Sequence, residues 1–125
     1  MRITLLGTGC PSVHPRRYGA SQLIEGMGAK VLVDCGNGCT QRLVQAGHSP
    51  AAVDALFVTH LHSDHLVDLW QLVVAGWHAG RPHPLRGRWL GRRVPTSMKV
   101  PGYRTPPPYH ATNVVVGSHS SLQST

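Results

Sequence analysis

The stretch Thr59-His60-Leu61-His62-Ser63-Asp64-His65 constrains this chain more than any other feature of its sequence. It follows a compact apolar run, Ala55-Leu56-Phe57-Val58, which is too short for a helix and is typical of a buried strand. It precedes a stretch in which apolar residues recur at helical spacing up to Ala75, with Gly76 as the expected stop. The pattern predicts a strand, a loop rich in metal-binding side chains, and a helix over residues 66–75.

The spacing of the polar residues in this loop predicts a metal site. In an extended chain residues two apart point to the same side, so His60 and His62 can bind one ion together. As the chain turns toward the helix, Asp64 and His65 can aim at a second point. Imidazole and carboxylate ligands favour Zn²⁺, with Mn²⁺ or Fe as alternatives. Two such ions would clamp a bridging water, lower its pKa and polarise the phosphoryl or carbonyl group that it attacks. A solvated histidine-rich turn is the alternative, and the H-x-H-x-D-H spacing disfavours it.

The first 85 residues alternate short strands with helices. Expected strands are Arg2–Gly7, Ser21–Glu25, Lys30–Asp34 and Asp54–Thr59, and the expected first helix is Cys39–Ala46. Gly26-Met27-Gly28 punctuates a hairpin between the second and third strands. This order predicts a mixed α/β fold. Cys35 and Cys39 lack the further ligands of a closed metal site, and we expect both to be small buried thiols.

Several separate sequence motifs resemble those of the metallo-β-lactamase-fold hydrolases, and of their ribonuclease Z-like branch in particular. They occur in the family's order: Leu5-Leu6-Gly7-Thr8-Gly9, Leu32-Val33-Asp34-Cys35-Gly36, Thr40-Gln41-Arg42-Leu43 before Ala46-Gly47, His60-Leu61-His62-Ser63-Asp64-His65, and Trp77-His78 up to Pro84. The resemblance covers about residues 1–85. It implies an αββα sandwich whose site binds two zinc ions at the sheet edge.

The resemblance also implies a role for each site residue. His60 and His62 would bind the first metal, and Asp64 and His65 the second. Asp64 is the candidate for orienting the attacking water or handling its proton. Asp34, near a strand end in the same layer, would support the metal ligands from behind. The implied reaction is phosphodiester hydrolysis of the tRNA 3′-end processing type, by a water that two zinc ions activate; sulfate-ester or cyclic-ester hydrolysis is the alternative.

The chain departs from the family beyond residue 85. Family members are considerably longer, and their remaining ligands, a histidine for each metal and a bridging aspartate, lie in that later part. No Asp or Glu follows Asp68 here, and the neighbours of His110 and His119 match no family motif. The sequence therefore reads as the N-terminal half of such a domain over residues 1–85, and an inactive fragment lacking the later ligands is a further alternative.

Residues 86–125 have a composition of their own. They carry six of the 12 Lys and Arg residues and none of the five acids, and five of the ten prolines fall between Pro95 and Pro108. One hypothesis is an out-of-frame translation that starts near codon 86. The other is a genuine basic, proline-rich arm that binds RNA. The net charge of +7 comes almost entirely from this segment.

The remaining expectations concern location and partners. Three cysteines are too few for a disulfide framework, and no apolar run reaches the length of a membrane helix, so we expect a cytoplasmic protein without a membrane partner. RNA or a small ester is the expected substrate, and a homodimer is possible within the family pattern.

Overall fold

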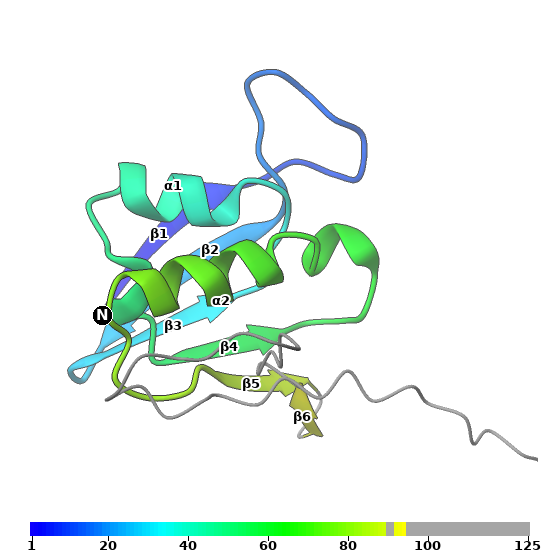
Figure 1. Cartoon of the computed structure of the whole chain (residues 1–125). Coiled ribbons are helices and arrows are strands. Elements are labelled where there is room, and N and C mark those ends of the chain that lie inside the picture. Colours follow the sequence, from blue (N-terminus) through cyan, green and yellow to red (C-terminus); the bar gives the residue numbers. More distant parts are fainter. Residues whose placement is uncertain (90–91, 95–125) are drawn as a thin grey trace, which may run out of the picture.

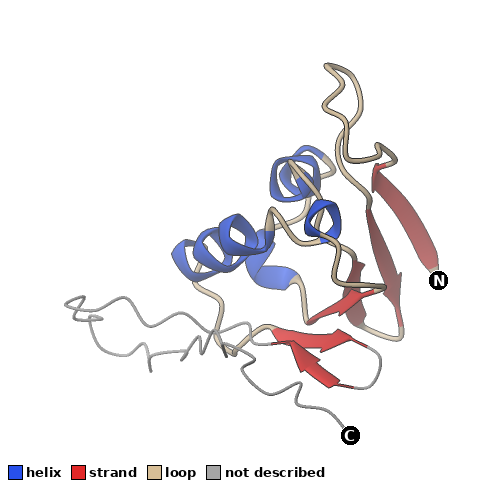
Figure 2. Cartoon of the chain, turned by 90° about the vertical axis from the view of Figure 1, so that its right-hand side faces the viewer, coloured by secondary structure: helices blue, strands red, loops and turns tan. Residues whose placement is uncertain are grey.

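The computed structural model of the chain describes residues 1–89 and 92–94. Six strands form one sheet in which the spatial order equals the chain order, and both α-helices lie on the same face of it (Figures 1 and 2). The elements are β1 (Arg2–Gly7), β2 (Ser21–Gly26), β3 (Ala29–Val33), α1 (Cys39–Gln45), the 3₁₀ turn η1 (Pro50–Ala52), β4 (Ala55–Val58), the 3₁₀ turn η2 (Ser63–His65), α2 (Leu69–His78), β5 (Arg86–Trp89) and β6 (Arg92–Val94).

Strand direction follows from whether an α-helix lies between consecutive strands. β2 and β3 form an antiparallel hairpin, and its turn residues Met27 and Gly28 have φ of 52° and 76°, as a tight turn between twisted strands requires. β3 and β4 are parallel, as are β4 and β5, because α1 and α2 carry the chain back across the sheet. At the two edges of the sheet, β1 pairs antiparallel with β2, and β6 pairs antiparallel with β5. The mixed α/β class expected from the sequence is confirmed.

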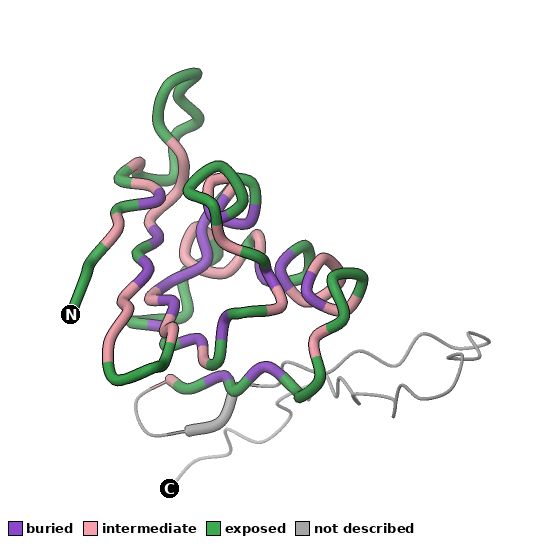
Figure 3. Tube along the Cα trace, turned by 90° about the vertical axis from the view of Figure 1, so that its left-hand side faces the viewer, coloured by how far each residue is buried: buried purple, intermediate pink, exposed green. Residues whose placement is uncertain are grey.

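The core lies between the sheet and the two helices. Leu23, Leu32 and Leu56 occupy one register row across β2, β3 and β4, and all three are fully buried. Leu43 of α1 and Leu72 of α2 close over this row and are equally inaccessible. Buried residues accordingly occur in the strands and in the helices that pack on them (Figure 3).

The opposite face of the sheet is also apolar. Its rows run through Ile3, Ile24, Val31 and Ala55, and then through Leu5, Gln22, Val33 and Phe57. Among them Ile3 is 54%, Leu5 59% and Phe57 40% exposed, because no element within the described residues covers them.

This arrangement corrects one expectation about the sheet. Without the later half of such a domain, we expect the face behind Leu56, Val58 and Leu69 to be uncovered. Leu56 and Val58 are instead 0% exposed because α1 and α2 cover their face of the sheet, and Leu69, which lies on α2, is 6% exposed. Side chains alternate along a strand, so the uncovered face belongs to their neighbours.

The second helix also differs from the prediction. It runs over Leu69–His78 instead of residues 66–75, and residues 63–65 form η2 before it. Gly76 lies inside the helix, at a point where a β-carbon would meet the Arg81 guanidinium at 2.8 Å. The chain leaves the helix at Gly80, whose φ of 78° suits a glycine after a C-terminus.

β5 and β6 are not predicted by the sequence pattern. Arg86 and Arg88 hide the apolar pattern that a buried strand usually shows, and the parallel pairing with β4 depends on the fold of the preceding 85 residues. The sheet thus continues past Leu85. Whether residues 86–125 are an out-of-frame translation or a genuine basic arm is not tested by this pairing, and both hypotheses stay predictions. His110 and His119 lie outside the described residues. Within the described part, no helix has the length and apolar character needed to cross a membrane.

Candidate metal centre

The loop between β4 and α2 lies at the carboxyl ends of the parallel strands β3 and β4 (Figure 1). Ligand sites in open α/β sheets gather at this edge because the chain leaves consecutive strands there toward the helix layer. Asp34 directly follows β3, and Thr59 and His60 directly follow β4. The pairing of the two strands therefore brings residues 25 positions apart to one point.

The backbone of Cys35 and Gly36 holds this loop in place. The Cys35 N–H donates to the His65 carbonyl at 2.8 Å, and its carbonyl accepts from the Asp68 N–H at 3.1 Å. A β-carbon on Gly36 would lie 2.6 Å from the Asp64 carbonyl oxygen, so only glycine allows the chain to pass so close to the loop. These contacts hold η2 and the start of α2 against the end of β3.

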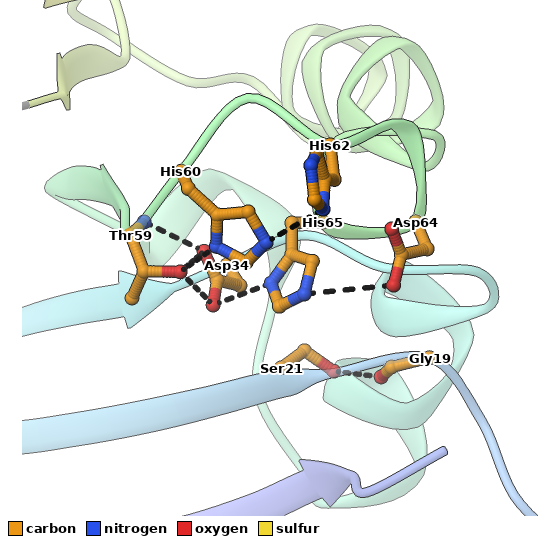
Figure 4. Close-up of polar contacts among 8 residues, drawn as sticks. All are labelled: Gly19, Ser21, Asp34, Thr59, His60, His62, Asp64 and His65. Atoms are coloured by element: carbon orange, nitrogen blue, oxygen red, sulfur yellow. Dashed lines mark hydrogen bonds and ion pairs between the residues drawn. The ribbon is translucent and has the colours of Figure 1, made fainter. Parts of the chain in front are cut away.

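His60 and His62 are brought together. The Nε2 atom of His60 lies 3.2 Å from Nδ1 of His62, and the ring centroids are 4.5 Å apart (Figure 4). His62 has extended backbone geometry, with φ −68° and ψ 144°, and the two side chains therefore lie on the same side as the spacing predicts.

Asp64 and His65 form the second pair. Asp64 Oδ2 lies 3.5 Å from His65 Nε2, and the other ring nitrogen, Nδ1, lies 2.8 Å from Asp34 Oδ2. The ring N–H is not aligned with Asp34, so this contact is an ion pair by distance and not a hydrogen bond. His65 also lies against His60, with ring centroids 4.0 Å apart, which joins the two pairs.

Thr59 links Asp34 to the first pair, and the sequence analysis did not single it out. Its N–H donates to Asp34 Oδ1 at 2.8 Å, and its hydroxyl lies 2.8 Å from Asp34 Oδ2 and 3.0 Å from His60 Nδ1. Asp34 is 5% exposed and contacts Thr59 and His65 at once (Figure 4). The sequence offered one signal for Thr59, which is its position directly after a buried strand and beside the first histidine.

The donor atoms fit a divalent metal in pairs. Two ligands of a tetrahedral zinc at ~2.0–2.1 Å are ~3.3 Å apart, which is the kind of separation that both pairs have. In the second pair His65 Nε2 faces the Asp64 carboxylate, and a shared cation would satisfy both atoms. Across the described part of the chain, however, no three His, Cys, Asp or Glu side chains are grouped so that they could hold one ion. Each pair alone offers two donors, fewer than the three protein ligands that are usual in a catalytic zinc site.

The two cysteines behind the loop are buried. Cys35 and Cys39 are free and fully buried, which confirms the expectation for them. The hydrogen bond to Cys39, and then burial, raise the pKa of the Cys35 thiol far above its usual range. A thiol held in this state supplies no thiolate for metal binding or nucleophilic attack.

Sequence comparisons place this site among known proteins. The family model described as "Anti-Pycsar protein Apyc1" matches residues 1–84. Ribonuclease Z of Mycobacterium marinum is 43% identical over 89 residues, which are 69% of this chain and 32% of that protein. Ribonuclease Z of Mycolicibacterium paratuberculosis is 46% identical over 77 residues, 62% of this chain and 28% of that protein. The chain thus spans about a third of the length of the curated relatives that it matches.

Solved structures agree on the fold. Human tRNase Z, short form (ELAC1), superposes with a TM-score of 0.61 at 28% identity, covering 68% of this chain and 32% of that one. The metallo-β-lactamase fold protein YhfI of Bacillus subtilis gives a TM-score of 0.62 at 24% identity, covering 70% of this chain and 37% of that one.

Proposed function

This chain belongs to the family described by the Apyc1 model, within the ribonuclease Z-like branch of the metallo-β-lactamase-fold hydrolases, and from that premise we propose that its loop at residues 60–65 serves metal-dependent phosphodiester hydrolysis. The observation that carries the proposal is the pairing of donors at one sheet edge, with His60 and His62 nitrogens 3.2 Å apart and Asp64 facing His65 at 3.5 Å. RNA, cleaved at the 3′ end of a tRNA precursor, is the proposed substrate.

Each residue of the loop has a separate proposed role. His60 and His62 would hold one zinc ion, and Asp64 and His65 a second, with Mn²⁺ or Fe as competing metals. Bound metal would supply a water of lowered pKa and a polarised phosphoryl group. Asp64 would orient that water or accept its proton, since the Asp64 side chain is 22% exposed at the open side of the loop. Asp34, whose side chain is 7% exposed, would orient His65 from the buried side.

Two other functions remain as alternatives. Sulfate-ester or cyclic-ester hydrolysis would use the same donors on a different substrate. An inactive fragment is favoured by one observation: each pair has two protein ligands, whereas catalytic zinc sites usually have three and a water. Turnover by the chain alone would exclude the inactive fragment, whereas a chain supplied with the later ligands distinguishes only between the two kinds of ester substrate.

A chimaeric enzyme tests the proposal directly. Residues 1–84 would replace the matching segment of the M. marinum ribonuclease Z, which then provides the rest of the domain. We expect metal-dependent cleavage of a tRNA precursor, and its loss in His62→Ala and Asp64→Ala versions that keep their circular dichroism spectrum. Ser63→Ala, on the same loop, is the matched control and should retain activity.

Substrate choice is measured on the same chimaera. A panel of a linear phosphodiester, a cyclic phosphodiester and a sulfate ester distinguishes the proposed reaction from its alternatives. A chimaera that folds and binds metal but cleaves no phosphodiester would overturn the proposal. Substantial activity of the Asp64→Ala version would remove both roles assigned to Asp64.

A further inference from the structure

A single hydroxyl group joins the buried carboxylate of Asp34 to the exposed imidazole of His60. Thr59 Oγ1 lies 2.8 Å and 3.0 Å from the two Asp34 oxygens and 3.0 Å from His60 Nδ1. The Thr59 N–H also donates to Asp34, at 2.8 Å, so Thr59 is held through both its backbone and its hydroxyl group.

The protons of this network can be placed by counting donors. An ionised carboxylate only accepts hydrogen bonds, and a hydroxyl has one proton to donate. The Thr59 hydroxyl proton therefore points to Asp34, since two oxygens 2.8 Å apart without a proton between them would repel each other. The hydroxyl then has only lone pairs left for His60, and the Nδ1 atom of His60 must be the donor.

From this geometry we propose that Thr59 is a positioning residue that fixes the neutral His60 ring in its Nδ1-protonated tautomer and so leaves the Nε2 lone pair facing His62. The inference deepens the proposed function, since Nε2 is the atom that would bind the metal. The hydrogen bond made by one ring nitrogen decides which nitrogen of a histidine is free to bind a metal. An unrestrained neutral imidazole in water favours the proton on Nε2, so removal of the hydroxyl blocks the metal-facing atom.

The tautomer is measured without any metal or substrate. Two-bond ¹H–¹⁵N spectra of the ¹⁵N-histidine-labelled chain, recorded at a pH where imidazoles are neutral, report which ring nitrogen carries the proton. We expect Nδ1 protonation of His60 in the unaltered chain and in Thr59→Ser, which keeps the hydroxyl. In Thr59→Val, which keeps the β-branched shape and lacks the hydroxyl, His60 should shift toward the Nε2-protonated form. Thr40→Val is the matched control, because the buried Thr40 hydroxyl has no partner within the described residues.

Metal affinity gives a second measurement. Loss of a group that orients a metal-bound histidine typically weakens metal binding by about 10–100-fold. In competition titrations with Zn²⁺ we expect a loss of about 10-fold in Thr59→Val and less than about 2-fold in Thr59→Ser and Thr40→Val.

Failure of this inference is distinguishable from failure of the proposed function. Nε2 protonation of His60 in the unaltered chain would overturn it even if no variant folds. An unchanged His60 tautomer in a folded Thr59→Val chain would overturn it as well. The predicted tautomer shift would uphold it whatever the chimaera cleaves, because that spectrum contains neither metal nor substrate.

Discussion

At the scale of single residues, Asp34 carries the strictest requirements in the site. Its φ of 59° lies in the left-handed region, which Asp and Asn tolerate better than other residues with a side chain. It is 5% exposed, accepts the Thr59 N–H and hydroxyl, and lies 2.8 Å from His65. A small acidic side chain satisfies the backbone conformation and both neighbours together.

Substitution of Asp34 should separate these contributions to stability. Asp34→Ala removes the acceptor of the Thr59 N–H and hydroxyl and strains the backbone, and we expect it to lower the free energy of unfolding by about 2–4 kcal/mol. Asp34→Asn keeps the tolerated conformation and one oxygen acceptor, and should lose only about 1 kcal/mol. Urea titration followed by far-ultraviolet circular dichroism at low protein concentration measures both. Equal losses in the two variants would contradict this assignment.

At the scale of elements, α2 is fastened to the rest of the fold through Gly76 and Arg81. The Arg81 guanidinium donates to the Val53 and Pro50 carbonyls, which links the end of α2 to η1 and the start of β4. Burial lowers the pKa of Arg81 from its usual value, which reflects how far this cation is removed from water. The glycine exists at this point of the helix because the guanidinium packs directly on its backbone.

Gly76→Ala should therefore destabilise the chain, although alanine is the better helix former by about 1 kcal/mol. The new methyl group would meet the Arg81 guanidinium at 2.8 Å and displace it from its two carbonyl partners. We expect a lower urea midpoint for Gly76→Ala alone. In an Arg81→Ala background the same change should be neutral or stabilising, and this double-mutant cycle isolates the contact.

Gly80→Ala is the control for that cycle. Gly80 has φ of 78° and open space around its α-carbon, so its substitution adds only backbone strain. Its effect should be the same with and without Arg81. A Gly76→Ala chain that is more stable than the parent would contradict the role given to Arg81.

At the scale of the whole molecule, the described part has one covered and one uncovered sheet face. α1 and α2 bury the first face, whereas Ile3, Leu5 and Phe57 of the second are between 40% and 59% exposed. Contiguous apolar surface of this kind promotes association between molecules. The behaviour of the isolated chain in solution should therefore depend on this face more than on the helix layer.

Charged substitutions on the two sides of the molecule test that expectation. Leu5→Lys and Phe57→Lys place a charge on the uncovered face and should shift the isolated chain toward monomer in analytical ultracentrifugation. Val44→Lys is the matched control, because Val44 is 54% exposed but lies on α1, on the other side of the sheet. Equal effects of all three variants would show that general surface charge, and not this face, controls association.

The same scale governs activity. As given, the 125-residue chain should bind Zn²⁺ weakly and show no significant turnover of a chromogenic phosphodiester, with or without added Zn²⁺ or Mn²⁺. Each ion finds two protein ligands in the loop, and without the bridging carboxylate expected from the family the two cations repel each other. Metal analysis, the ester assay and thermal melting measure this together. Cooperative melting with metal-dependent turnover would refute the argument that each ion has too few protein ligands. It would then require His110 or His119 to complete the site.

The sequence by itself determined the local features of this protein. The H-x-H-x-D-H spacing brought His60 and His62 together because residue alternation in an extended segment is a local property. The strands up to β4, the Gly26–Gly28 hairpin and helix α1 followed from short-range periodicity and turn chemistry. Only the tertiary structure decided which sheet face is covered, that β5 pairs with β4, and that Gly76 lies beneath Arg81 instead of ending a helix. It also joined Thr59 and His65 to Asp34, because contacts between residues 25 or more apart depend on how whole strands pair, which no local pattern encodes.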